Sequence, residues 1–463
     1  MIDADTITAI ATPPGVSAVA VLRISGTRAR AIGAKCFDQR RVSSQSRPAV
    51  LRRGWLVDSR SGEKIDDALA VWFFAPHSYT GEDIVELHVH GGAGVVAAAL
   101  ASVLRAGARL AAPGEFTKRA FLNGCMDLAQ AEAVADLISA ETARSARAAA
   151  QRLQGAAGRI LRELRRELLA RLVEIEAHVD YPDEVPAPDE RELGDCIASQ
   201  CTRLHEMLQG ATAARVLRDG IDCVIAGPPN AGKSSLLNAL LEAERAIVSS
   251  TPGTTRDIIE DRLAVDGVVL RLRDTAGLRE TTDVIELQGV ARARSAIADA
   301  ELVLTVIDGS QKLTAEDYVV LAATAATTRV VICNKLDLGD QGLAPLRAAC
   351  SSEGNGERQR FVAGSILDRR TIAEVREAIS DLGWGGTTYD ASRAQIANGR
   401  EIEALTRALE ALQHAAATVA ASHPVDLLSG DLRAAAAAYG EVTGDTVTAE
   451  VIEGIFSRFC VGK

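Results

Sequence analysis

The sequence predicts a mixed α/β and α fold, in which a domain of alternating strands and helices is inserted into a helical domain and follows an α+β domain. Three observations predict this organisation. The pattern G-x-x-x-x-G-K-S occupies 227–234, between the apolar run DCVIAG and the helical run SLLNALL. Helical periodicity surrounds that domain, at 121–217 and again at 379–463. Short β-rich runs fill the first 120 residues.

The composition limits the function classes. A chain of 463 residues with 47% hydrophobic residues can form several cores, and its net charge of −11 argues against binding nucleic acid by bulk charge. The eight cysteines form no C-x-x-C pair, which favours reduced thiols. The acidic N-terminus does not resemble a signal peptide, and no apolar run is long enough to span a membrane. We therefore expect a soluble cytoplasmic protein.

The first 120 residues alternate strand and turn signals. The expected strands are TITAIA, AVAVLRIS, ALAVWFF and DIVELHVHGG, and the run GVVAAALASVLRAGA predicts a helix that ends at Gly107. His88 and His90 lie two apart near a strand end, but no third residue with suitable spacing suggests a metal site.

The region 121–217 is helical. Apolar residues recur there at steps of three and four, namely Leu161, Leu164, Leu168, Leu172, Ile175 and Val179. Tyr181-Pro182 ends this helix, and another follows through Leu204 and Leu208. After 391 the helical pattern returns, so we expect the two helical flanks of the inserted domain to pack together.

An arginine-rich stretch lies in the first helical flank, at Arg144, Arg147, Arg152, Arg159, Arg162, Arg165 and Arg166. We interpret it as a solvated helix face that pairs with Glu163 and Glu167. The alternative is a contact for nucleic-acid phosphates or a partner protein.

The pattern at 227–234 predicts a phosphate-binding loop, because it joins a strand to a helix. Backbone N–H groups would point at the phosphates from a run of six residues: Asn230, Ala231, Gly232, Lys233, Ser234 and Ser235. Lys233 would reach the β- and γ-phosphates, and the Ser234 hydroxyl would bind Mg²⁺.

Two downstream motifs extend this site. Asp274-x-x-Gly277 follows an expected hairpin whose turn is Asp266-Gly267. Asp274 would hold the Mg²⁺ shell through water, and the Gly277 N–H would meet the γ-phosphate.

The strand VVIC ends in Asn334-Lys335-Leu336-Asp337. The Asp337 carboxylate can accept from both the N1–H and the 2-amino group of guanine, whereas adenine offers no such pair. Asn334 would hold the loop, and the Lys335 stem would lie along the base. GTP or GDP is therefore expected, with ATP as the alternative. Ser365 or Gly364, in RFVAGSILD, is the candidate for a further base-binding loop.

The residue after Gly277 is Leu278, so the glutamine that orients water in small GTP-binding switches is missing. The loop 249–257 lies where a switch would cover the phosphates. Its Thr255 can complete the Mg²⁺ shell, and its carbonyls, with Asn230, can hold a monovalent cation that replaces an arginine. Glu286 is one candidate for orienting the water, although the residues alone give it no advantage over Glu280 or Asp283.

These motifs resemble those of the MnmE (TrmE) family of tRNA-modifying GTPases. The resemblance runs from end to end, because it also includes SYTGEDIVELHVHGG, PGEFTKRAFLNGCMDLAQAEAVADLI and the terminal FSRFCVGK. The resemblance implies a folate-binding and dimerisation domain at 1–120, a helical domain at 121–217 and 379–463, and a P-loop GTPase domain at 218–378. It also implies a homodimer that joins the flavoprotein MnmG (GidA) in a heterotetramer. That complex would add a (carboxymethyl)aminomethyl group to C5 of wobble uridine 34 of certain tRNAs. The implied cofactors are GTP, Mg²⁺, K⁺ and 5-formyl- or 5,10-methylene-tetrahydrofolate.

The resemblance also assigns residues. It assigns Glu286 the role of orienting the water. The implied Mg²⁺ ligands are Ser234 and Thr255. The implied K⁺ ligands are Asn230, Ser249, Thr251 and Thr254. Folate would meet Arg23, Glu86 and Lys463, at a site where Cys125 stands in place of a lysine common in the family. Cys460 matches a family cysteine with a role in modification, although a lone cysteine is as often a buried apolar residue.

Two other functions compete with this one. The chain would then be a regulatory GTP switch that binds ribosomes, or a one-carbon carrier whose nucleotide domain is only structural. Folate binding tests the first alternative, and K⁺-stimulated GTP turnover tests the second.

Overall fold

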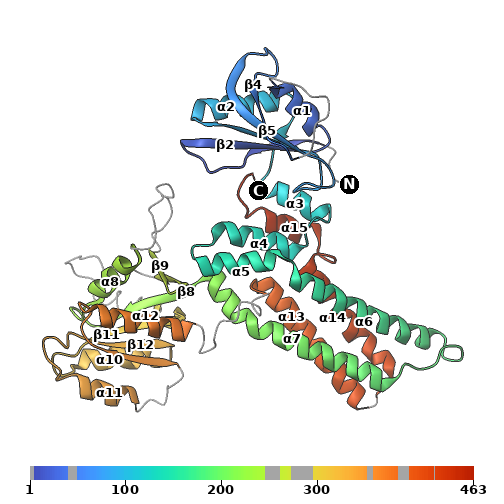
Figure 1. Ribbon diagram of the computed structural model, residues 1–463. Helices are drawn as coiled ribbons and strands as arrows, with labels where there is room; N and C mark the ends of the chain where they lie inside the picture. Colours follow the sequence, from blue (N-terminus) through green and yellow to red (C-terminus); the bar gives the residue numbers. More distant parts are fainter. Residues whose placement is uncertain are drawn as a thin grey trace. The chain divides into compact units, whose positions relative to one another are not determined.

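Two compact units make up the chain (Figure 1). The computed structural model describes residues 5–39, 49–245, 261–272, 296–351, 358–383, 396–421 and 423–462. The first unit comprises Met1–Ala135, Arg152–Gln200 and Ala404–Lys463, and the second comprises Asp136–Gln151 and Cys201–Glu403. The finer division into three domains remains a prediction.

The N-terminal part of the first unit is built on a sheet. Within the described residues, seven strands pair in the order β3-β4-β5-β6-β2-β1-β7. The strands are β1 (Ile7–Ile10), β2 (Ser17–Ser25), β3 (Phe37–Gln39), β4 (Arg52–Val57), β5 (Lys64–Phe73), β6 (Ile84–Gly91) and β7 (Arg109–Leu110). Helices α1 (Ala29–Cys36) and α2 (Ala93–Arg105) pack on it through Ile32 and Val103, which share a core with Leu22 and Leu87. All four expected strands and the expected helix are confirmed.

Helix α3 (Glu115–Leu122) carries a buried charge network. Arg119 is 4% exposed, and its guanidinium donates to Asp5 Oδ1 at 2.6 Å, Glu115 Oε1 at 3.0 Å and Glu82 Oε1 at 3.2 Å. Burial works to raise the pKa of Glu115, but hydrogen bonds from Arg109 and the Ala112 N–H lower it from 4.5 to about 2. The network therefore favours the charged forms of its carboxylates in the folded state.

Helices from both flanks of the inserted region pack together in the first unit, as expected. The helices of the flanks are α4 (Leu128–Ser139), α5 (Ala143–Leu153), α6 (Ala156–Asp180), α7 (Glu190–Asp219), α13 (Gly399–Ala420), α14 (Leu428–Thr443) and α15 (Ala449–Phe456). Most of α5 and of α7 belongs to the second unit. Tyr439 and Gln200 are both fully buried, and the Tyr439 hydroxyl donates to Gln200 Oε1 at 3.0 Å. Arg165 Nε donates to the Ala436 carbonyl at 3.2 Å.

Two expectations for α6 are corrected. Val179 was expected on the buried face, but it is 47% exposed, because it lies in the last turn before Tyr181 ends the helix. The arginine pairing also differs from the expected one. Arg162 binds Asp127 at 2.7 Å and Arg165 contacts Asp445 at 3.6 Å, so these arginines link α6 to neighbouring segments.

The second unit holds a mostly parallel sheet. Within the described residues its order is β13-β12-β11-β8-β10-β9, and only β9 is antiparallel. The strands are β8 (Ile221–Ala226), β9 (Asp261–Val265), β10 (Val268–Leu272), β11 (Leu302–Asp308), β12 (Arg329–Asn334) and β13 (Gln359–Ala363). The expected hairpin is confirmed, with Asp266 and Gly267 at φ of 49° and 91°.

Helices cover both faces of this sheet. Helices α8 (Lys233–Arg245) and α12 (Arg369–Gly383) share one core with the strands, through Leu236 and Val375. Helices α10 (Ala315–Thr324) and α11 (Leu343–Ser351) share another, through Leu321 and Leu346. Parallel strands under two helical layers bring the loops after β8, β11, β12 and β13 to one edge.

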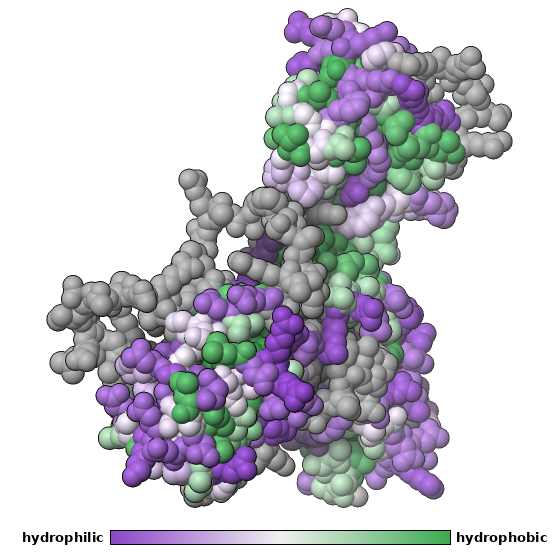
Figure 2. Space-filling model, turned by 60° about the vertical axis from the view of Figure 1, so that its left-hand side comes forward, coloured by the Kyte–Doolittle hydropathy of each residue, from purple (hydrophilic) through white to green (hydrophobic). Residues whose placement is uncertain are grey.

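The surface is largely hydrophilic on one face (Figure 2), and the cysteines are present as thiols. On the face drawn in Figure 2, hydrophilic residues surround small apolar groups. Within the described part of the chain, no helix combines the length and the hydropathy needed to cross a bilayer. All eight cysteines lie among the described residues and are free thiols, as expected.

The Arg119 network yields a stability prediction. We expect Arg119→Met to lower the free energy of unfolding by about 3–5 kcal/mol, because three carboxylates lose a buried cation. Urea unfolding, monitored by the fluorescence of Trp55 on β4 and Trp72 on β5, measures this free energy. The control is Arg53→Met, since the Arg53–Asp67 pair is exposed and contributes at most about 1 kcal/mol. Equal losses in the two variants would contradict the prediction.

The stability that this network provides should also fall at acid pH. Since the folded-state pKa of Glu115 is lowered from 4.5 to about 2, its contribution is present above pH 4.5 and is lost as the pH falls toward 2.

Candidate functional site

The phosphate-binding loop joins β8 to α8, as the motif predicts. Asn230 adopts φ of 61° and Gly232 φ of 109°, so two residues of the loop are left-handed. A Cβ at position 232 would lie 2.3 Å from Asn334 Nδ2, which only glycine avoids. The loop leads directly into the N-terminus of α8, which is the positive end of that helix, and the Ala231 N–H donates to the Pro228 carbonyl at 3.4 Å.

Lys233 closes this loop from within. Its Nζ donates to the carbonyls of Gly227 and Pro228, each at 2.8 Å. Burial holds the pKa of the Lys233 ammonium below its ordinary value, so an anion beside it would be favoured. Ser234 and Ser235 follow on the first turn of α8 and are exposed, while Ala231 is buried.

Asn334, at the end of β12, binds two loops at once. Its Nδ2 donates to the Ala231 carbonyl at 2.8 Å, and its Oδ1 accepts from the Ile366 N–H at 3.0 Å. Asn334 is 4% exposed. The phosphate-binding loop and the loop after β13 are therefore fixed to one buried amide.

The loop after β12 carries the expected base-binding residues. Lys335 adopts φ of 64°, and Asp337 is exposed in the turn that follows. Lys335 Nζ lies 2.7 Å from Asp308 Oδ2, at the end of β11. Asp308 belongs to no motif in the sequence, so motif reasoning missed it; only its place at a strand end could have suggested it.

The loop after β13 lies beside these residues. The Gly364 N–H donates to the Cys333 carbonyl at 3.0 Å, and the Gly364 carbonyl accepts from the Leu336 N–H at 3.2 Å. Ser365 Oγ accepts weakly from the Leu367 N–H at 3.4 Å. The contact with Asn334 is made by the backbone of Ile366, which no side-chain pattern could have identified.

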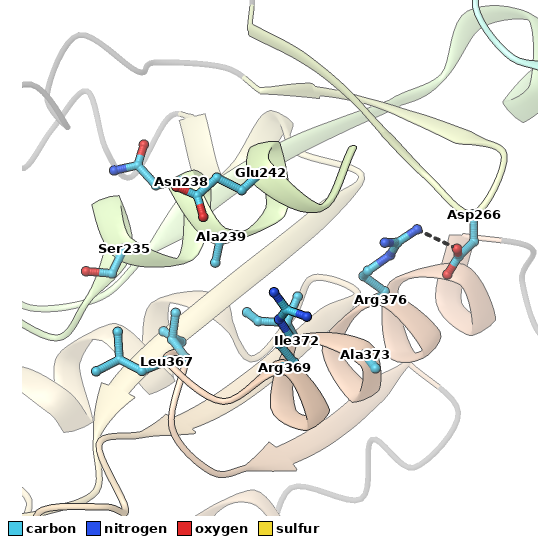
Figure 3. A pocket seen from close by; sticks show the side chains of 11 residues that line it. Ser235, Asn238, Ala239, Glu242, Asp266, Leu367, Arg369, Ile372, Ala373 and Arg376 are labelled. Carbon is cyan, nitrogen blue, oxygen red and sulfur yellow. Dashed lines mark hydrogen bonds and ion pairs between the residues drawn. The ribbon is translucent and has the colours of Figure 1, made fainter. Parts of the chain in front are cut away.

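A groove of about 1010 Å³ runs between α8 and α12, next to this edge of the sheet (Figure 3). Each helix lines it with one face, and the hairpin turn closes one end, where Arg376 binds Asp266 at 2.7 Å. Ser235 and Ile366 line it too, so the groove shares walls with the phosphate-binding loop and the loop after β13.

Several predicted residues lie outside the described residues. They are Ser249, Thr251, Thr254, Thr255, Asp274, Gly277, Glu286 and Lys463. Their roles remain predictions.

A second cluster lies on the N-terminal sheet. Arg23 on β2 and Glu86 on β6 are paired in register, and Arg23 Nε donates to Glu86 Oε1 at 2.8 Å. The guanidinium carbon of Arg23 lies 5.3 Å from the centre of the Tyr79 ring and 5.7 Å from that of Phe116. The structure thus brings the two predicted residues together and adds two aromatic rings that the sequence did not single out.

Two exposed thiols lie elsewhere in the first unit. Cys125 lies beside Gly81, where an added Cβ would be 2.9 Å from its Sγ. The carbonyl of Cys460 accepts from the Gly114 N–H at 3.3 Å, and Gly462 lies against Ile10. The terminal segment is therefore held against the N-terminal sheet and the start of α3. Among the described residues, no group of three or more His, Cys, Asp or Glu is placed to hold a metal ion.

Comparison with known proteins agrees with these motifs. Two family models match: GTP-binding protein TrmE N-terminus over residues 6–125 and MnmE helical domain over residues 128–460. A tRNA modification GTPase MnmE of Geobacillus thermodenitrificans is 42% identical, with 100% of each chain covered. That of Enterococcus faecalis is 41% identical over 99% of this chain and 98% of the relative. The chain therefore belongs to the MnmE (TrmE) family of tRNA modification GTPases.

Proposed function

We propose that this chain is a K⁺-dependent GTP hydrolase which, with the flavoprotein MnmG, adds a (carboxymethyl)aminomethyl group to C5 of wobble uridine 34 of certain tRNAs. The one-carbon unit would come from 5-formyl- or 5,10-methylene-tetrahydrofolate. The single observation that carries the nucleotide part is the Asn334 amide, which binds both the phosphate loop and a base-binding loop. Full-length relatives named tRNA modification GTPase MnmE support GTP hydrolysis in tRNA modification. The K⁺, the folate donor, MnmG and the added group rest on the family resemblance of the sequence motifs.

The residues of the phosphate-binding loop fit a nucleoside triphosphate with Mg²⁺. The loop ends at the N-terminus of α8, where helix N–H groups favour an anion, and Lys233 brings a desolvated ammonium. The exposed hydroxyl of Ser234 suits Mg²⁺, which Thr255 would complete. Guanine would be selected by Asp337. Bound Mg²⁺ supplies charge stabilisation on the phosphates.

The proposed K⁺ site combines Asn230 with three residues of the loop 249–257: Ser249, Thr251 and Thr254. Asn230 is exposed, and its side-chain carbonyl is the kind of neutral oxygen that can bind a monovalent cation. Leu278 occupies the place of a water-orienting glutamine, and the family resemblance assigns that role to Glu286.

The Arg23–Glu86 cluster fits a folate. The Glu86 carboxylate can accept from the donor edge of a pterin, and the Tyr79 and Phe116 rings offer apolar faces to it. Arg23 and the terminal Lys463 suit the glutamyl carboxylates. Cys460 precedes Lys463 in the segment that lies against this sheet, which supports a role for its thiol in the modification step. The active assembly would be a cytoplasmic homodimer joined to MnmG.

The guanine assignment can be tested by one substitution. Asn at position 337 offers one donor and one acceptor, which match xanthine instead of guanine. We expect Asp337→Asn to weaken GDP binding at least about a hundredfold and to create xanthosine diphosphate binding. Calorimetric titration measures both, with Asp340→Asn from the same turn as the control. If Asp337→Asn still prefers GDP to xanthosine diphosphate, this carboxylate is not the group that recognises guanine.

The hydrolysis scheme can be tested with salts. GTP turnover should be faster in KCl than in NaCl at equal ionic strength. Glu286→Ala should slow turnover by about a hundredfold or more while GDP binding is kept. Glu280→Ala and Asp283→Ala are the matched controls. Equal turnover in Na⁺ and K⁺ would rule out the cation site.

The modification step can be followed by mass spectrometry of tRNA nucleosides. Cells that lack this protein should lose the C5-modified wobble uridine and regain it with the wild-type chain. Arg23→Met should restore GTP turnover but not the modified nucleoside, because the folate site loses its cation. Arg53→Met, at an exposed ion pair on the same sheet, should restore both. Full restoration by Arg23→Met would remove Arg23 from the folate site.

A further inference from the structure

We propose that Asp308 is a positioning residue for guanine recognition, which acts by holding the ammonium group of Lys335. The inference rests on the proposed GTP binding and adds to it a residue that lies outside the nucleotide-binding motifs.

The Asp308 carboxylate is fixed on both oxygens. Its Oδ2 lies 2.7 Å from Lys335 Nζ, while its Oδ1 accepts from the Ser310 N–H at 3.0 Å and from Ser310 Oγ at 2.6 Å. The side chains of Asp308 and Lys335 are 24% and 29% exposed. Although burial works to raise the pKa of Asp308, the bonds from Lys335 and Ser310 hold it below its ordinary value. The pair is therefore charged and partly shielded from solvent.

The pair spans two strand ends. Asp308 is the last residue of β11 and is paired in register with Asn334, the last residue of β12. Lys335 follows Asn334, so its side chain must reach across to the neighbouring strand, a distance of about 4.8 Å between strand axes. The ion pair thus stretches the methylene stem of Lys335 between the two ends.

The backbone of Lys335 is held at the same place. Its φ of 64° is left-handed, a region that lysine rarely adopts. The Gly309 N–H donates to the Asn334 carbonyl at 2.8 Å, and the Leu336 N–H donates to the Gly364 carbonyl at 3.2 Å. With backbone and ammonium both fixed, the stem is a preorganised apolar surface between the cradle and Asp337, where the face of a base can lie while Asp337 reads its edge.

A plain stabilising ion pair would have the same geometry, so the test must separate the two roles. Full-length protein is titrated with a fluorescent GDP analogue. We expect Asp308→Asn to weaken binding about tenfold, and Lys335→Met, which keeps an apolar stem but loses the ammonium, to weaken it by a similar factor. The double variant should be no weaker than either single one, since each removes the same interaction.

Two further measurements sharpen the test. Inosine diphosphate lacks the 2-amino group that Asp337 would accept from, so Asp308→Asn should weaken GDP and inosine diphosphate by the same factor. The control is Asp381→Asn on α12, the same chemical change at an exposed pair with Arg360 of β13, which should leave binding unchanged. Melting temperatures without nucleotide report any loss of folding.

Three results would overturn the proposal. They are wild-type affinity in Asp308→Asn, wild-type affinity in Lys335→Met, and losses that multiply in the double variant. If Asp308→Asn does not fold, the Lys335→Met result decides. If the wild-type chain binds no GDP analogue, the proposed nucleotide function fails first, and that outcome is distinct from a wild type that binds while its variants do not change.

Discussion

The nucleotide site depends on one buried amide. Asn334 uses its donor on the carbonyl of Ala231 and its acceptor on the N–H of Ile366, so two loops far apart in the sequence share one anchor. An aspartate there would lose the donor and leave the Ala231 carbonyl unpaired, and a leucine would lose both bonds. The same amide lies so close to position 232 that the cradle must have glycine there. One side chain therefore links the phosphate-binding loop to the loop after β13.

The topology of the sheet explains why this anchor exists. In a parallel sheet the carboxyl ends of β8, β11, β12 and β13 meet at one edge, so four short loops must share a small volume. In the loops after β8 and β12, Asn230 and Lys335 both take left-handed conformations that cost a non-glycine residue free energy. Such strain persists only where neighbours determine the geometry, which Asn334 and Asp308 do here.

The sequence predicted the features that depend on local order. The cradle follows from a strand, a glycine-rich loop and a helix in succession, and the hairpin follows from Asp266-Gly267 between two β-rich runs. Contacts between distant segments could not be predicted from the sequence, because they depend on which strands become neighbours. Asp308 meets Lys335 across two strand ends, and Tyr79 and Phe116 meet Arg23 from other loops and helices. The expected pairing of the α6 arginines with Glu163 and Glu167 was wrong for the same reason, since Arg162 binds Asp127, which lies on a distant segment.

The cluster on the N-terminal sheet places a charge constraint on any folate bound there. Arg23 already has one anion, Glu86, at 2.8 Å, so the pair is close to neutral. A pterin that donates to Glu86 would share this carboxylate with the Arg23 guanidinium, which could then also attract a second anion. A folate tail brings more negative charge than one arginine neutralises. Since Cys125 stands where members of the family often have a lysine, the affinity for that tail would depend chiefly on the second cation, which is the role proposed for Lys463.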